Sequence, residues 1–265
     1  MSDIQSQRLQ RVYESAKQAL NIETQVTPAT LKTPATVYHM DISFRTTRNK
    51  WSIAKRYSEF YKVRRVLLKF FKQIKSQAGD IALPAPLQAL ESALVATFPR
   101  RHLRGDNPAI IEERRATLEV FVQMLVKVIS CIPLSPEPAT ATVSTREVAS
   151  LAQLYQILRD FLVYPDKQIE SEAKLKLAVL SLEDVVVDSQ SNILDADESL
   201  NDCCSICLGD WNDDECVGMN VVRLPCMHAF HEECVMEWLH GNTHCPMCRE
   251  EPSLDEHQLA CRHTF

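Results

Sequence analysis

The stretch CCSICLGDWNDDECVGMNVVRLPCMHAFHEECVMEWLHGNTHCPMC, residues 203–248, decides the fold of the C-terminal part of this 265-residue chain. Its cysteines and histidines recur at gaps of one or two residues, and longer segments of eighteen and ten residues divide them into groups. A gap of two residues suits a tight knuckle that directs both side chains at one ion. The candidate metal ligands are Cys204, Cys207, Cys226, His228, His231, Cys234, Cys245 and Cys248.

These ligands are enough for two tetrahedral sites, so the sequence predicts two Zn2+ ions as cofactors. Nine of the ten cysteines lie at or beyond Cys203. In a chain without a secretory signal, clustered cysteines and histidines favour a metal site over a disulfide framework. The segment is too short to bury a large core, so we expect zinc to supply much of its folding free energy, on the order of 10 kcal/mol or more per site.

Closed sites with four protein ligands leave no position for a metal-bound water, which disfavours catalytic zinc. Two alternatives for the ligand set stay open. Cys203 competes with Cys204 for the first position, although a gap of three residues to Cys207 makes a poorer knuckle. His244, next to Cys245, offers a substitute within the last pair.

The segment resembles a RING finger of the variety with two central histidines, and the resemblance covers about a quarter of the chain. It implies a small cross-braced domain in which the ligands of the two ions interleave. One ion would be held by Cys204, Cys207, His231 and Cys234, and the other by Cys226, His228, Cys245 and Cys248. The resemblance also implies a RING-type ubiquitin ligase whose partner is a ubiquitin-conjugating enzyme carrying ubiquitin.

RING ligases dock the conjugating enzyme on a shallow apolar groove. The residues at the matching positions are Ile206, Trp238 and Pro246. Arg249 matches a position from which many such ligases contact both the enzyme and its ubiquitin, and a planar guanidinium can bridge two surfaces. This contact would position ubiquitin for attack by a substrate lysine, with no covalent intermediate on this chain. The alternatives are that Trp238 is a core residue and that Arg249 pairs with Glu250 or Glu251.

The net charge of −6 hides an asymmetry along the chain. Residues 25–165 carry 20 basic and 11 acidic groups, whereas residues 166–265 carry 6 basic and 21 acidic groups. A basic surface favours an anionic membrane or a nucleic acid, and an acidic one disfavours both. The basic part lacks the stacked aromatics and glycine-rich loops of nucleic-acid binders, so we expect no nucleic-acid partner.

The basic part begins with a predicted β-hairpin. Residues 36–44 alternate between apolar and polar side chains, residues 47–50 suit a turn, and residues 51–56 resume the strand. Ser58 is expected to cap a following helix, whose apolar positions recur at helical spacing from Phe60 onward.

A second helix is predicted from the dipeptide Asn107-Pro108, a cap followed by proline at the first helical position. Its apolar stripe runs from Leu118 to Ile129 and ends, toward the N-terminus, at Arg114. A charge in line with a buried face requires an anionic partner.

Three motifs together resemble a phox-homology (PX) domain: RYSEF at residues 56–60, FPRRHL at 98–103 and EERRATLEVF at 112–121. The resemblance spans residues 25–165. It implies a small antiparallel sheet packed on helices and, as in many members, binding of phosphatidylinositol 3-phosphate on endosomal membranes.

Carried over by position, the resemblance gives four residues a role in lipid binding. Arg56 would hold the 3-phosphate, Tyr57 would stack under the inositol ring, Arg101 (or, less favoured, Arg100) would contact the 1-phosphate, and Arg114 would bond the remaining ring hydroxyls. Guanidinium groups match phosphate oxygens in bidentate geometry, which suits these assignments.

The alternative is that Arg56 and Arg114 only pair with acids such as Glu59 and Glu113. The sequence also departs from the family, because an apolar insert at residues 87–98 separates the proline-rich loop from Pro99. The insert would either enter the lipid interface or form an extra amphipathic helix packed on the core. The family lysine at the 1-phosphate position is an arginine here, which keeps the charge.

We therefore expect an α+β fold, in which a PX-like small antiparallel sheet packs on a helical subdomain and a zinc-stabilised cross-brace RING domain follows. The predicted boundaries are 1–24 for an N-terminal amphipathic helix or extension, 25–165 for the PX-like domain, 166–202 for an acidic linker, 203–250 for the RING finger and 251–265 for a C-terminal tail. The N-terminal helix is predicted over Ile4–Ile22, and a short helix is predicted over Glu170–Leu182 within the linker. Residues 133–145 are predicted to form a loop inside the PX-like domain.

The function that follows is a membrane-recruited ubiquitin ligase acting on an unidentified protein substrate. The chain lacks the roughly 18 uninterrupted apolar residues of a membrane span and the apolar core of a signal peptide, so we expect a cytoplasmic protein, peripheral on endosomal membranes. The alternative is a non-enzymatic endosomal trafficking adaptor that uses the zinc finger only to bind proteins.

Overall fold

The computed structural model of the chain describes residues 4–5, 7–9, 11–12, 20–30, 35–44, 49–78, 83–102, 106–132, 145–185, 203–211 and 220–252. These residues form two compact units. The basic unit contains the described residues of Leu20–Phe44 and Asn49–Asp166, and the finger unit contains those of Met1–Ala19 and Lys167–Phe265. In the sequence, the basic unit is therefore inserted between two segments of the finger unit. No described helix is long and apolar enough to cross a membrane.

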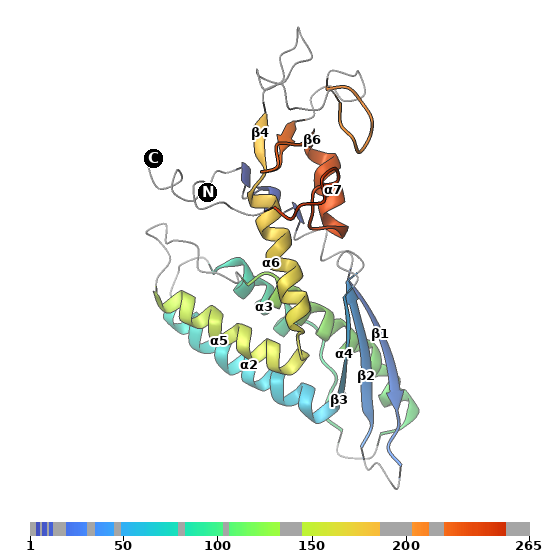
Figure 1. Cartoon of the computed structure of the whole chain (residues 1–265). Coiled ribbons are helices and arrows are strands. Elements are labelled where there is room, and N and C mark those ends of the chain that lie inside the picture. Colours follow the sequence, from blue (N-terminus) through green and yellow to red (C-terminus); the bar gives the residue numbers. More distant parts are fainter. Residues whose placement is uncertain are drawn as a thin grey trace. The chain divides into compact units, whose positions relative to one another are not determined.

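The basic unit contains a three-stranded antiparallel sheet (Figure 1). Its strands, in sheet order, are β1 (Leu20–Thr27), β2 (Val37–Phe44) and β3 (Lys50–Arg56). In this register Ile42 lies opposite both Ile22 and Trp51, so apolar side chains meet across the three strands. The predicted hairpin is confirmed as β2 and β3.

The start of the sheet corrects one expectation. The predicted N-terminal helix extends to residue 22 and the predicted boundary falls at residue 24, but Leu20 already begins β1. Burial along β1 alternates from Leu20 onward, as expected for a strand with one face on the core. The period of two from Leu20 to Val26 decides the structure there, and the helical pattern holds only nearer the N-terminus, where the described residues between 4 and 12 are helical.

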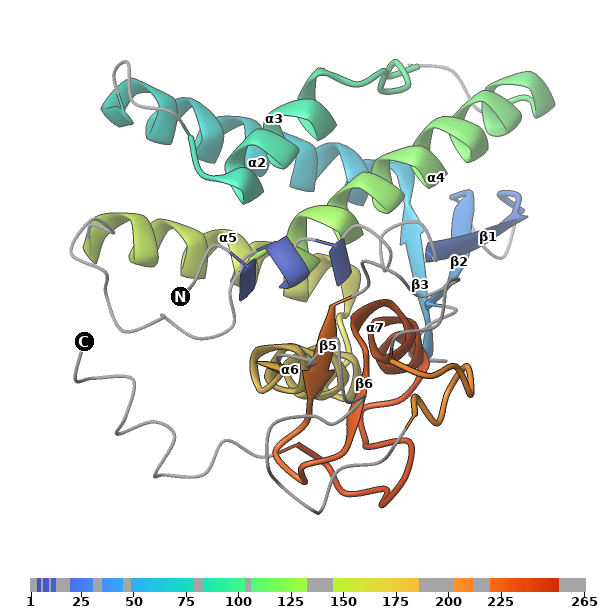
Figure 2. The ribbon, with the colours of Figure 1, turned by 90° about the horizontal axis from the view of Figure 1, so that it is seen from above.

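Four helices are described in the basic unit. They are α2 (Tyr57–Ala78), α3 (Ala85–Val95), α4 (Pro108–Ser130) and α5 (Thr145–Leu162). Of these, α2 and α4 make the main contacts with the sheet. Helices α2 and α5 contact each other and run alongside one another (Figures 1 and 2). The ring of Phe60 on α2 meets Tyr38 of β2 at 6.3 Å and Phe161 of α5 at 5.4 Å, both edge to face. Each such side chain contributes about 1.5–3 kcal/mol by burial.

Side-chain hydrogen bonds fix the starts of α2 and α4. Asn107 accepts a hydrogen bond from the Ile110 amide at 2.8 Å, which confirms the predicted cap of α4. The predicted cap at Ser58 is wrong, because α2 begins at Tyr57 directly after β3. There Glu59 accepts a hydrogen bond from the Arg56 amide at 2.9 Å, the arrangement in which a third-position carboxylate reaches back to the cap residue.

The apolar insert at residues 87–98 forms α3 over most of its length. Leu87, Leu90 and Leu94 are buried, and α3 contacts α2 and α4. This supports the alternative of an extra helix packed on the core. Val95 at the end of α3 stays 81% exposed.

The finger unit contains a second antiparallel sheet. Its strands are β4 (Glu183–Val185), β5 (Val221–Arg223) and β6 (Ala229–His231), in that order, and its helices are α6 (Asp166–Leu180) and α7 (Glu232–Gly241). Figure 2 looks along α6 and shows β5 and β6 beside it. One hydrophobic core joins α6, the sheet and α7.

This core corrects the predicted acidic linker of residues 166–202. Leu175, Val179 and Leu182 are buried in it, and Leu9 and Val12 of the N-terminal helical segment join them. The short helix predicted over Glu170–Leu182 is present as α6, but the acidic composition of the segment did not indicate that its apolar face is buried in a core. Residues 186–202, the predicted loop up to residue 144, and the tail beyond residue 252 lie outside the described residues.

Candidate metal centres and basic pocket

Cluster 1 combines Cys204, Cys207, His231 and Cys234, whose ligand atoms all lie within 4.8 Å of one another. The first two cysteines come from a knuckle closed by a 2.7 Å bond from the Leu208 amide to the Cys204 carbonyl. His231 ends β6 and Cys234 lies in the first turn of α7. The sheet and the helix therefore bring the second pair to the first.

Cluster 2 combines Cys226, His228, Cys245 and Cys248 within the same 4.8 Å limit. The Nδ1 atom of His228 lies 3.3 Å from the Cys226 sulfur and 3.6 Å from the Cys245 sulfur. The Arg249 amide donates to the Cys245 carbonyl at 3.0 Å and closes the last knuckle. The structure thus brings together the two interleaved sets that the RING resemblance implies.

The electrostatics of both clusters suit a metal ion. Burial raises the pKa of the Cys226 and Cys234 thiols to about 12, so a bare cluster would hold protons at neutral pH. Burial also works to raise the pKa of Cys207, but hydrogen bonds from the Gly209 backbone and from neighbouring thiols outweigh it and lower that pKa. Three sulfurs and one imidazole at each centre are the ligand set that soft or borderline cations prefer, and such a cation would displace the protons.

The alternative ligands lie outside the clusters. Cys203 pairs with Asp210 in a β-bridge. His244 packs edge to face on Trp238 at 6.0 Å, and its carbonyl accepts a 2.9 Å bond from the Trp238 indole. The structure therefore favours Cys204 and Cys245 as the members of the two sets.

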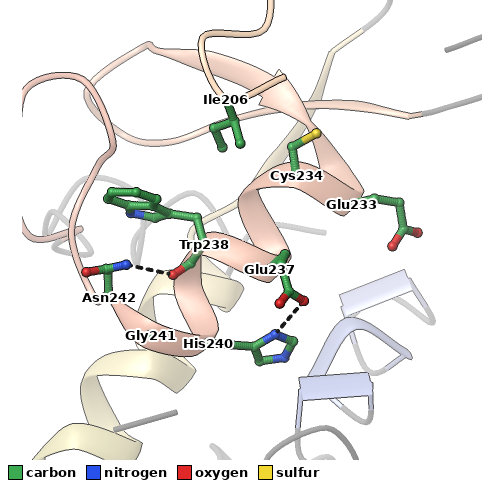
Figure 3. Close-up of a pocket in the computed structure, with 8 residues that line it drawn as sticks. All are labelled: Ile206, Glu233, Cys234, Glu237, Trp238, His240, Gly241 and Asn242. Atoms are coloured by element: carbon green, nitrogen blue, oxygen red, sulfur yellow. Dashed lines mark hydrogen bonds and ion pairs between the residues drawn. The ribbon is translucent and has the colours of Figure 1, made fainter. Parts of the chain in front are cut away.

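A groove lies between the first knuckle and α7 (Figure 3). It is lined by Ile206, Glu233, Cys234, Glu237, Trp238, His240, Gly241 and Asn242. Two of the predicted docking residues, Ile206 and Trp238, line it, whereas Pro246 lies half-buried in the last knuckle and is not among the lining residues. The ring contact with His244 and the bond from its indole N–H to the His244 carbonyl hold Trp238 in a fixed orientation. The sequence did not point to the acidic rim of Glu233 and Glu237.

Arg249 is exposed and has a left-handed backbone with φ of 63°. Leu208, the residue after the other knuckle, has the same conformation with φ of 62°. A side chain in this region costs about 1–3 kcal/mol relative to its ordinary conformations, and glycine avoids that cost. Among the described residues no acid pairs with Arg249, and Glu251 pairs instead with Lys174 of α6 at 2.9 Å.

The start of α7 rests on a buried charge cluster that the sequence did not reveal. Arg8 is 1% exposed and donates to the carboxylates of Asp184 and Glu232, the latter at 3.0 Å. Burial works to raise the pKa of Glu232, but bonding and attraction to Arg8 outweigh it and lower that pKa. Arg11 pairs with Glu233 at the rim of the groove at 3.1 Å. The N-terminal segment therefore supports the helix that carries Cys234 and Trp238.

The basic pocket is built around Tyr57, the first residue of α2. Its hydroxyl donates to the Pro99 carbonyl at 2.8 Å, and the Arg114 guanidinium carbon lies 3.9 Å from its ring centroid. Burial raises the pKa of Tyr57 and outweighs the positive charges of Arg114, Arg101 and Arg64, which act to lower it. These arginines therefore lie close enough to the Tyr57 hydroxyl to affect its pKa. The segment after Pro99 and the start of α4 thus bring Arg101 and Arg114 near Tyr57, whereas Arg56 precedes Tyr57 in the chain as the last residue of β3.

The two alternative ion pairs are not formed as expected. Glu59 bonds to the backbone amide of Arg56, and the Arg56 side chain is exposed. Arg114 pairs with Asp106, eight residues earlier in the chain, rather than with Glu113. Asp106 is a pocket residue that the sequence analysis missed.

The family matches agree with both halves of this description. The Ring finger domain family matches residues 202–249, and the PX domain family matches residues 45–137. Together with the two antiparallel sheets and their helices, these matches confirm the expected α+β fold and the PX-and-RING architecture. Helix α6, strand β4 and the N-terminal segment lie outside both matches.

Similar proteins match over the finger alone. "E3 ubiquitin ligase BIG BROTHER-related" of Arabidopsis thaliana is 41% identical over 59 residues, which are 22% of this chain and 16% of that protein. "E3 ubiquitin-protein ligase arkadia" of Xenopus tropicalis is 45% identical over 53 residues, 20% of this chain and 5% of that protein. "E3 ubiquitin-protein ligase RNF181" of Rattus norvegicus is 36% identical over 53 residues, 20% of this chain and 30% of that protein. The chain therefore spans less than a third of the length of these relatives.

Proposed function

We propose that this chain, which carries a PX domain and a RING finger, is a membrane-recruited ubiquitin ligase. The observation that carries the proposal is the pair of interleaved Cys/His clusters with a groove beside them that Ile206 and Trp238 line. In this proposal the groove docks a ubiquitin-conjugating enzyme carrying ubiquitin. The ubiquitin ligases among the similar proteins support the reading of the finger.

Two Zn2+ ions, one in each cluster, would hold the knuckles and α7 in fixed relation. The chemistry that zinc supplies here is structural, since four protein ligands close each site. The chain itself contributes binding and positioning: Trp238 and Ile206 bind the enzyme, and the exposed Arg249 contacts enzyme and ubiquitin together. Holding ubiquitin in one orientation raises the rate of attack by a substrate lysine without a covalent intermediate on this chain. The cost of a left-handed backbone at Arg249 supports a role for its side chain.

The basic unit would bind phosphatidylinositol 3-phosphate and place the protein on endosomal membranes. Arg56 would hold the 3-phosphate, Tyr57 would underlie the ring, Arg101 would contact the 1-phosphate and Arg114 would bond ring hydroxyls. The positions of Arg114 and Arg101 near Tyr57 support their part of the assignment. Recruitment to a surface raises the effective concentration of membrane-bound substrates, so a weak affinity for each substrate suffices.

Autoubiquitination in a reconstituted reaction tests the ligase proposal. We expect Arg249→Ala and Trp238→Ala to lower the rate by at least about tenfold while the bound zinc is retained, because each loss removes a contact worth more than about 1.4 kcal/mol. Arg115→Ala, which removes an exposed charge from the basic unit, is the control and should act like the wild type. A wild type inactive with a broad panel of conjugating enzymes would favour the adaptor alternative.

Sedimentation with liposomes tests the lipid proposal separately. We expect Arg56→Ala to abolish pelleting with vesicles that contain phosphatidylinositol 3-phosphate. Arg65→Ala is the matched control, because it removes the same charge from an exposed position of α2. Equal pelleting of Arg56→Ala and the wild type would rule out this site.

A further inference from the structure

Asp106 is the acid of the basic pocket that pairs with the buried Arg114. The Arg114 side chain is 4% exposed and the Asp106 side chain is 21% exposed. The carboxylate thus forms the more accessible part of the pair. A molecule that approaches Arg114 meets Asp106 at the same time.

The guanidinium is held in place from a second side. Its carbon lies 3.9 Å above the Tyr57 ring, and its Nε atom is buried with no hydrogen-bond partner among the described residues. Buried polar atoms without partners are uncommon in proteins and call for an explanation. Asp106 therefore fixes Arg114 without using all of its five N–H donors.

The carboxylate determines which ligand groups fit beside it. An ionised carboxylate only accepts hydrogen bonds, so a hydroxyl can donate to it while another oxygen contact is made to Arg114. A phosphate at the same position is also an acceptor and carries like charge, so it gains no bond and is repelled. Discrimination between two ligands can rest on such a repulsive element as well as on attractive contacts.

We propose that Asp106 is a specificity-determining residue that makes the Arg114 side of the pocket accept the hydroxyls of an inositol ring and reject additional phosphates there. The inference rests on the proposed phosphoinositide binding and deepens it: the pocket takes a singly phosphorylated headgroup. Arg56 and Arg101, both exposed, remain available for the phosphates that the pocket does accept.

The test uses the full chain with vesicles that contain equal mole fractions of either phosphatidylinositol 3-phosphate or a bisphosphate that carries a second phosphate at ring position 4 or 5. Vesicles whose phosphatidylserine content matches their total charge measure non-specific attraction. The variants are Asp106→Asn, which keeps a hydrogen-bond acceptor for Arg114 but removes the charge, and Asp106→Glu, which keeps the charge. Glu113→Gln is the control for loss of an exposed acid near the start of α4.

We expect the wild type, Asp106→Glu and Glu113→Gln to prefer the monophosphate, and Asp106→Asn to reduce that preference by about tenfold, mainly by gaining affinity for the bisphosphate. If Asp106→Asn weakened binding to both lipids equally, Asp106 would be only a clamp for Arg114 and the inference would be wrong. An unchanged preference would overturn it as well. A wild type that binds no phosphoinositide above the phosphatidylserine control would instead refute the lipid proposal on which the inference rests.

Discussion

The two candidate sites differ in whether their charges are balanced before a ligand binds. In the finger unit, half-buried thiols such as Cys226 and Cys234 gather with no charge of their own, and their raised pKa leaves them protonated until a cation binds. In the basic unit, a buried guanidinium already has its counter-ion, because Arg114 pairs with Asp106. The first site therefore depends on its ligand for folding, and the second is assembled without one.

Metal removal should give the largest difference in stability between the two units. We expect a strong chelator to unfold the finger unit and to leave the basic unit folded, because structural zinc contributes on the order of 10 kcal/mol per site. Calorimetry should show two transitions in the metal-loaded chain, of which only one survives chelation. Acid should act in the same direction, since protons compete with the metal for raised-pKa thiols and metal affinity falls as pH falls. Equal loss of both transitions would contradict the comparison.

Removal of a buried charge partner should have the next largest effect, and only in the finger unit. Arg8→Ala removes the buried charge partner of Glu232 and leaves this buried carboxylate near the start of α7 with only the exposed Arg11, at 3.6 Å, as a charged partner among the described residues. Breaking a buried pair costs about 3–5 kcal/mol. Urea unfolding of the finger-unit transition measures this loss.

Two variants sharpen that prediction. Arg11→Ala removes an exposed guanidinium that pairs with Glu233 at 3.1 Å and more loosely with Glu232 at 3.6 Å, so its cost should stay within about 1 kcal/mol. The pair Arg8→Met with Glu232→Gln should recover part of the loss, because no charge is then left buried. An Arg8→Ala chain as stable as the wild type would show that the N-terminal segment does not support α7.

A core substitution tests whether α6 belongs to the finger unit. Leu175 is 6% exposed and Leu177, two residues along the same helix, is 40% exposed. We expect Leu175→Ala to cost about 2–5 kcal/mol and Leu177→Ala well under half of that, as measured on the finger-unit transition. A linker would tolerate both changes equally.

The sequence predicted those parts of each site that depend on residues close together in the chain, and it missed those that depend on distant residues. The C-x2-C gaps specify both knuckles, and Asn107-Pro108 specifies the start of α4, because capping and knuckle formation depend on neighbours in the chain. The role of Arg8 could not be predicted from the sequence, because its partner Glu232 lies 224 residues away in the chain. Asp106 was missed for a different reason: a single acid in a loop looks like an ordinary surface charge until the fold places Arg114 against it.

Composition was a poor indicator of structure at the sequence boundaries between the two units. The many acids of residues 166–202 suggested a linker, although Leu175, Val179 and Leu182 form a buried face within it. The mixed pattern around Leu20 suggested a continuing helix, although the strand period prevails from that residue onward. Both errors arose where packing against a distant segment, rather than local propensity, decides the structure.

The smallest expected effect concerns the helix cap beside Asp106. Asn107→Ala removes the 2.8 Å bond to the Ile110 amide, and loss of such a cap costs about 1 kcal/mol. Because α4 carries Arg114 in its second turn, we expect a lower midpoint for the basic-unit transition and no change in the finger-unit transition. Asn107→Asp restores the acceptor and should restore the midpoint. If Asn107→Ala lowered the finger-unit transition by the same amount, the two units would unfold together, and the contrast between a ligand-dependent and a preassembled site would not hold.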